Sequence, residues 1–181
     1  MKRSGPMPRE VGFGPDAPRI ARPTARRADA WWWAIAVVSL AAVAAALVSQ
    51  HGFGMEPCPW CVLQRLIFVA IGVFALLGLV WRGPAGSRVA GTFALMLAVA
   101  GIAAALWQHL VAARSASCKL TLADRIMSAS QLDRLLPDVF EARASCADAA
   151  VKLFGLPYAM WSALAFVVCA VVLVGILRRS A

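Results

Sequence analysis

The stretch EPCPWCVLQR, residues 56–65, places two cysteines at the mouth of a long apolar run, with an arginine one helical turn inside it. The thiolate is the reactive form of cysteine, and a helix N-terminus or a nearby arginine lowers the pKa of a thiol. A helix that starts near Cys61 puts that sulfur at the positive end of the helix dipole, and Arg65, four residues on, shares its face. Cysteines three apart can also come within disulfide reach. The stretch therefore predicts a redox-active pair beside a positive charge at membrane depth.

The composition indicates an integral membrane protein. Of the 181 residues, 61% are hydrophobic, whereas soluble domains are roughly 45–50% apolar, and the excess comes in long blocks. The net charge of +9 arises from basic residues at the ends of these blocks. Because that pattern follows the positive-inside rule, we expect the lipid bilayer as a partner and no nucleic acid.

Four apolar segments have about the ~20 residues that cross a bilayer. The sequence predicts an all-α membrane protein, a four-helix transmembrane bundle, with spans at about residues 31–49, 62–81, 89–112 and 157–177. Residues 1–30 are rich in Pro, Gly and Arg, which predicts a disordered basic cytoplasmic tail. Residues 178–181 form the predicted cytoplasmic C-terminus.

The charge pattern also predicts the orientation. The N-terminal tail, the turn at residues 82–88 and the C-terminus are basic, and an even number of spans puts all three on the cytoplasmic side. Loops at about residues 50–61 and 113–156 then face outward. These two loops carry four of the five cysteines: Cys58, Cys61, Cys118 and Cys146. In an oxidising compartment such cysteines can form disulfides.

The second outer loop is long for a helical hairpin, and loops longer than about 12–15 residues are usually functional or disordered. Its residues 130–140 have apolar side chains at helical spacing, although Pro137 must kink or end the helix. We therefore expect a short helix in this loop that lies in the membrane interface.

Each cysteine pair also has a plainer interpretation than catalysis. Cys58 and Cys61 can form a structural disulfide, or half of a zinc site completed by the other two cysteines. Cys118 and Cys146 can staple the loop that they close, which stabilises by roughly 3–4 kcal/mol on the chain-entropy model. Because two disulfides on one side of the membrane can pass electrons by thiol–disulfide exchange, we favour four catalytic cysteines and no metal.

Two further residues have two interpretations each, and a third has only a structural one. Arg65 either extends to the interface as a membrane anchor or stabilises a thiolate or an electron acceptor. His109, at the outer end of the third span, suits an interfacial side chain as well as a ligand contact. Cys169 lies in the middle of the fourth span and predicts inert packing.

Short motifs follow one another along the chain in a definite order. They are PCPWCVLQR (57–65), WQHL (107–110) followed by Cys118, LPDVF (136–140), SCA (145–147), FGL (154–156) and WS (161–162). Together they resemble the disulfide bond formation protein B (DsbB) family, the quinone-coupled thiol oxidases of the bacterial inner membrane. The resemblance covers about residues 31–177 and implies a four-helix transmembrane bundle.

The resemblance also implies the roles of the site residues. Cys58 and Cys61 correspond to the pair nearest the quinone, with Cys61 in contact with ubiquinone or menaquinone and Arg65 beside it. His109 contributes to the quinone site. Cys118 and Cys146 correspond to the shuttle pair, and Cys118 is the position that forms a mixed disulfide with the soluble periplasmic thiol oxidase DsbA.

The implied function is that of a membrane thiol:quinone oxidoreductase, which reoxidises a DsbA-like partner and so supports protein disulfide bond formation. Three alternatives remain open. A quinone reductase of the vitamin K epoxide reductase type also has a Cys-x-x-Cys motif, but late in the chain, whereas here it precedes the second span. The others are a non-enzymatic tetraspan protein with structural outer disulfides and a zinc-stabilised membrane module.

Overall fold

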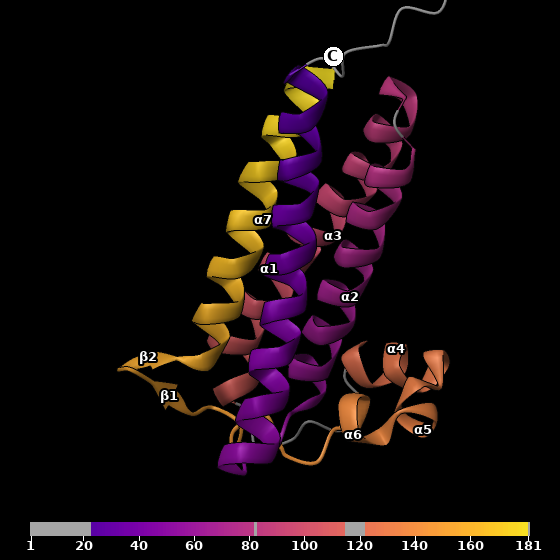
Figure 1. The fold of residues 1–181 in the computed structure, drawn as a ribbon. Helices are drawn as coiled ribbons and strands as arrows, with labels where there is room; N and C mark the ends of the chain where they lie inside the picture. Colours follow the sequence, from indigo (N-terminus) through magenta and orange to yellow (C-terminus); the bar gives the residue numbers. More distant parts are fainter. Residues whose placement is uncertain (1–22, 82, 115–121, 181) are drawn as a thin grey trace, which may run out of the picture.

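The structure is a computed structural model that describes residues 23–81, 83–114 and 122–180. Four long helices dominate it: α1 (Pro23–Phe53), α2 (Pro59–Val80), α3 (Pro84–Leu110) and α7 (Tyr158–Ser180). All four are long and apolar enough to cross a membrane. They lie side by side as one bundle (Figure 1). The predicted all-α, four-helix membrane fold is therefore confirmed.

The helices extend beyond the apolar segments that predict them. Residues 23–30 continue α1, which corrects the predicted boundary of the disordered tail at residue 30; residues 1–22 lie outside the described part of the chain. Helices α2 and α3 begin at Pro59 and Pro84, before the predicted starts of their spans. Proline suits the first helical position because it has no N–H to leave unpaired there. Hydropathy thus locates the membrane segment, whereas local capping sets the helix end.

Helix α2 packs between α1 and α3, α3 packs against α7, and a smaller contact between α1 and α7 closes the ring. Small residues permit the close approaches. A Cβ atom at Gly101 would lie 2.5 Å from the ring of Phe166, and one at Gly78 would lie 2.7 Å from the ring of Trp32. The ring of Phe68 stacks on that of Phe166 with centroids 3.9 Å apart. The core therefore depends on aromatic rings seated against glycine.

Three short helices lie in the long connection between α3 and α7: α4 (Leu122–Ser130), α5 (Leu132–Leu135) and α6 (Pro137–Phe140). The helix predicted at residues 130–140 is therefore two helices, broken where Pro137 starts a new one. Helix α4 was not expected, and Gln131 separates it from α5 with a left-handed backbone (φ 53°). The single predicted helix is corrected to a three-helix segment beside the end of α2.

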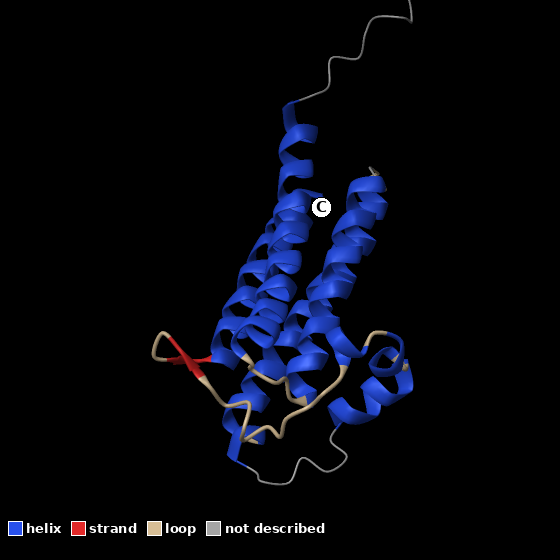
Figure 2. Ribbon diagram, turned by 60° about the horizontal axis from the view of Figure 1, so that its bottom comes forward, coloured by secondary structure: helices blue, strands red, loops and turns tan. Residues whose placement is uncertain are grey.

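The remaining connections complete this end of the molecule. A 3₁₀ turn, η1 (Ala112–Arg114), follows α3, and β1 (Lys152–Leu153) pairs antiparallel with β2 (Leu156–Pro157). The hairpin and the three short helices lie at the same end of the bundle, on opposite sides (Figures 1 and 2). The connection between α2 and α3 and the end of α7 lie at the other end. The basic last turn of α7, with Arg178 and Arg179, is thus separated along the bundle axis from the hairpin and the three short helices.

Candidate redox site at the loop end of the bundle

The first turn of α2 brings the Cys-x-x-Cys sulfurs together. Cys58 is the residue that caps the helix, with an extended backbone (φ −83°, ψ 167°), and its Sγ accepts a hydrogen bond from the N–H of Cys61 at 3.4 Å. The two Sγ atoms lie 2.9 Å apart. An unpaired N–H at a helix start is usually satisfied by an oxygen from the capping side chain. Here a sulfur does so, and the same geometry holds the two thiols within reach of a disulfide.

Cys146, from the second loop, reaches the same place. It is fully buried in one apolar cluster with Cys58. Hydrogen bonding with Cys146 is the largest cause that raises the pKa of Cys58 above its ordinary value, followed by hydrogen bonding with Cys61 and by burial. The backbone N–H groups of residues 143–144 both donate to the carbonyl oxygen of Pro57, at 3.0 and 3.2 Å. The loop that carries Cys146 is therefore tied to the residue just before Cys58.

Arg65 is buried beside this pair and does not extend to the surface. Only 5% of its area is exposed, so the membrane-anchor interpretation does not describe it. Its Nη1 donates to Oε1 of Gln50 at 2.6 Å and to the carbonyl of Val139 at 2.9 Å, and its Nη2 donates to the carbonyl of Ala46 at 3.3 Å. Arg65 thus joins α1 and α6 to α2, while its Nε has no hydrogen-bond partner among the described residues.

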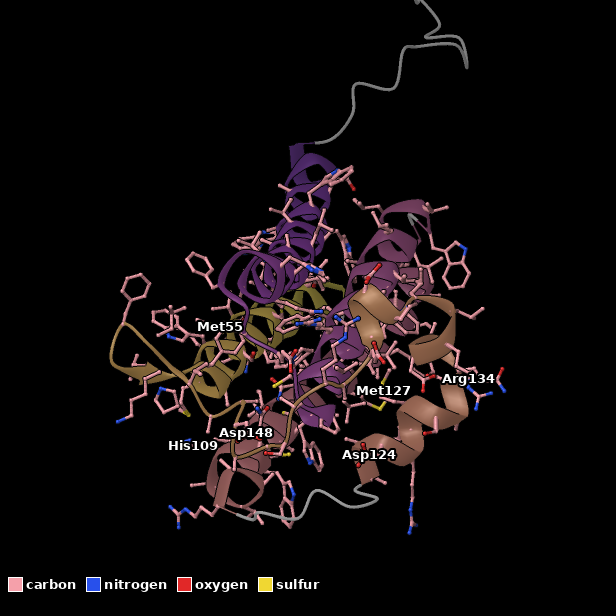
Figure 3. All side chains as sticks on the ribbon, turned by 90° about the horizontal axis from the view of Figure 1, so that it is seen from below. Met55, His109, Asp124, Met127, Arg134 and Asp148 are labelled. Carbon is pink, nitrogen blue, oxygen red and sulfur yellow. The ribbon has the colours of Figure 1, made fainter. Side chains whose placement is uncertain are left out.

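Two cavities meet at Cys61 and Arg65. The inner one, about 250 Å³, lies among α1, α2 and α7, with walls that include Phe68 and several alanines. The outer one, about 480 Å³, extends toward the loops, where Met55 and Asp148 line it; Figure 3 labels both residues in the view from this end. Since Cys61 and Arg65 line both cavities, the predicted sharing of one helix face is confirmed.

Buried glutamines were missed as site residues from the sequence. Nε2 of Gln64 donates to Oε1 of Gln108 at 2.6 Å, and Nε2 of Gln108 lies 3.1 Å from Sγ of Cys61 and 3.4 Å from Sγ of Cys58. Gln50 contacts Arg65. The signal was present in the sequence, because a polar side chain inside a spanning helix is costly and marks a functional site by default.

Three other cysteine or histidine residues considered from the sequence are not seen to contact the sulfurs of Cys58 and Cys61 in the described part of the chain. His109, labelled in Figure 3, is half-buried and lines neither cavity. Successive residues of a helix point roughly 100° apart, and its neighbour Gln108 is the residue that contacts the sulfurs. Cys118 lies outside the described residues. Cys169 is buried in the bundle core.

Comparisons of the sequence with known proteins indicate one family. The sequence profile described as "Disulfide bond formation protein DsbB" matches residues 27–176. Proteins named "Disulfide bond formation protein B" are 32% identical over 154 residues in Cupriavidus metallidurans (80% of this chain, 90% of the relative) and 35% identical over 159 residues in Ralstonia nicotianae (83% and 94%). The relative from Burkholderia pseudomallei is 34% identical over 148 residues (80% and 87%).

The four-helix membrane bundle with paired cysteines at one end therefore defines a disulfide-forming membrane oxidoreductase. More particularly, the chain belongs to the DsbB family, and the resemblance predicted from its motifs is confirmed.

Proposed function

We propose that this protein is a thiol:quinone oxidoreductase that reoxidises a periplasmic DsbA-like dithiol oxidase and passes the electrons to ubiquinone or menaquinone. One observation carries the proposal. Buried Cys146 contacts Cys58, Cys58 lies 2.9 Å from Cys61, and Cys61 lines a cavity with buried Arg65. This order of sulfurs supports an electron path from the loop end into the membrane part of the bundle.

The exchange steps balance with four cysteines. The dithiol partner attacks Cys118, breaks the Cys118–Cys146 disulfide and leaves oxidised, with two electrons and two protons transferred. The thiolate of Cys146 then attacks Cys58 and breaks the Cys58–Cys61 bond, so that the electron pair comes to rest on Cys61. Cys118 finally attacks Cys146 and releases Cys58, which restores the outer disulfide and leaves the inner pair reduced.

The inner cavity fits the head group of a quinone. Ligand pockets are roughly 300–1,000 Å³, so a cavity of about 250 Å³ suits a single ring and not its tail. Its walls are mostly apolar, and the buried Nε of Arg65 is a donor with no partner among the described residues. Arg65 and Cys61 would hold the ring, and the quinone would supply an acceptor for two electrons and two protons. The charge of Arg65 stabilises a thiolate on Cys61, because Coulomb attraction is strong where water is scarce.

The energetics favour such an acceptor. A DsbA-type couple lies near −120 mV, and about 30 mV corresponds to a factor of ten for two electrons. Protein disulfides of ordinary stability, below about −300 mV, cannot reoxidise it. A strongly oxidising acceptor beside Cys61 resolves this difficulty.

We also propose that the protein lies in the bacterial inner membrane, with both termini in the cytoplasm and residues 50–61 and 113–156 in the periplasm. The basic N-terminal region, the basic residues at 82–88 and Arg178–Arg179 support this orientation through the positive-inside rule. The periplasm is also the compartment in which disulfides persist.

The test is Cys61→Ser in membranes that contain quinone, with Cys169→Ser as the control for loss of a buried thiol. We expect Cys61→Ser to abolish catalytic oxidation of a DsbA-like dithiol, measured as loss of free thiols, and Cys169→Ser to retain it. Undiminished oxidation by Cys61→Ser contradicts the proposal. Trapping of free thiols during turnover distinguishes this proposal from a non-enzymatic tetraspan protein, because the structural disulfides of such a protein stay closed.

A further inference from the structure

A pair of buried amides joins α2 to α3 beside the cysteine pair. Gln64 and Gln108 are 3% and 4% exposed, and Nε2 of Gln64 donates to Oε1 of Gln108 at 2.6 Å. Buried amides are costly unless they are hydrogen-bonded, and more so within a membrane span. The short contact satisfies the carbonyl oxygen of Gln108 and fixes the orientation of its amide.

That orientation determines what Gln108 presents to the sulfurs. Because its oxygen accepts from Gln64, its N–H groups face Sγ of Cys61 at 3.1 Å and Sγ of Cys58 at 3.4 Å. An N–H donor favours the charged form of an acceptor over the neutral one. The shorter contact goes to Cys61, the sulfur that also lines the cavity with Arg65.

We infer that Gln108 is a catalytic hydrogen-bond donor that stabilises Cys61 as a thiolate, and that Gln64 is the positioning residue that aims its amide. The inference rests on the proposed function for its place in the reaction. When Cys146 attacks Cys58, a Cys146–Cys58 bond forms, the Cys58–Cys61 bond breaks, and the electron pair goes to Cys61. A leaving thiolate that is better stabilised departs faster, so the amide accelerates the transfer of electrons toward the cavity.

The test measures the thiolate of Cys61 directly, without quinone or partner. In the full chain, Cys58, Cys118, Cys146 and Cys169 are replaced by serine, so that Cys61 is the one cysteine left, and its alkylation by iodoacetamide is followed across pH in lipid nanodiscs. We expect Gln108→Leu to lower the alkylation rate at neutral pH about tenfold, which corresponds to a profile moved up by roughly one pH unit.

Two further variants separate chemistry from folding. Gln64→Leu frees the Gln108 amide to turn and is expected to give a smaller fall in rate. In the double variant no amide is left unpaired, and replacing both partners by apolar groups can be nearly neutral for stability. The double variant is therefore expected to regain thermal stability over the single ones and yet keep the alkylation profile of Gln108→Leu.

The inference is overturned if the alkylation profiles of Gln108→Leu and of the double variant superimpose on that of the parent protein or move to lower pH. Such a result leaves the proposed function intact, because neither electron acceptor nor dithiol enters the measurement. Conversely, failure of Cys61→Ser to block dithiol oxidation removes the proposed function and leaves the amide–sulfur contact to be judged by alkylation alone.

Discussion

The two ends of α2 bury different chemistry in the same bundle. At the loop end, Gln64 and Arg65 are buried polar residues one turn from the cysteines. At the other end, Gly78 packs against the ring of Trp32 with no polar group between them. Buried polar groups cost free energy unless they are paired, so a bundle optimised for packing alone has no reason to collect them at one end. The contrast supports the proposal that the reactive site lies at the loop end of the bundle.

The largest effect is expected at Arg65, the charged residue of the polar end. Arg65→Ala removes the positive charge beside Cys61 and three hydrogen bonds to α1 and α6. Hydrogen bonds to charged groups contribute about 1.5–3 kcal/mol, so we expect kcat/KM for quinone to fall roughly tenfold to a hundredfold with a higher apparent KM. Steady-state quinone reduction in nanodiscs measures both.

Arg65→Lys is the matched control. Lysine keeps the charge but loses the planar fork that donates to several acceptors at once, so an intermediate KM is expected. A normal KM for quinone in Arg65→Ala would show that Arg65 only holds α2 against α1 and α6. The contrast between the two ends of α2 would then have no functional meaning.

How far the sequence predicts this site depends on the range of the interactions. The pairing of Cys58 with Cys61, and the shared face of Cys61 and Arg65, follow from helical spacing alone, so they could be predicted. The contact of Cys146 with Cys58 joins two loops, and no periodicity encodes which residues of two loops meet. The same applies to Val139, whose carbonyl accepts from Arg65.

His109 and Gln108 show a second limit. Both lie in one short motif, and the choice between them depends on the rotation of α3 against α2, which is set by packing along the whole helix. The long helices were predictable because apolar length decides them, whereas α4 depends on contacts with the end of α2. Local pattern thus predicts the elements, and tertiary packing selects the residues that face the site.

A smaller effect is expected at the apolar end. Gly78→Ala places a methyl group 2.7 Å from the ring of Trp32, and overpacking of this kind costs about 1–3 kcal/mol. We expect a lower melting temperature in detergent, with KM for quinone unchanged in the folded fraction. Gly175→Ala is the control, since a Cβ atom there meets nothing within 4 Å. A raised KM in Gly78→Ala would mean that the two ends are coupled through α2.

The smallest effect concerns pH and the cap of α2. Contact with Cys146 and Cys61, together with burial, raises the pKa of Cys58 in the folded protein, whereas an unfolded cysteine titrates near pH 8.5. The folded state therefore holds the proton more tightly, and its advantage is full below about pH 8.5 and declines as the pH rises above that value.

We expect the reduced protein to lose stability relative to Cys58→Ser between about pH 8 and 9.5, by up to about 1.4 kcal/mol per pH unit above the unfolded pKa. Thermal unfolding of both proteins under reducing conditions, scanned over this range, measures the difference. Parallel curves would mean that Cys58 titrates alike in the folded and unfolded states. The polar end would then differ from the apolar end in its buried amides and Arg65, and not in its capping thiol.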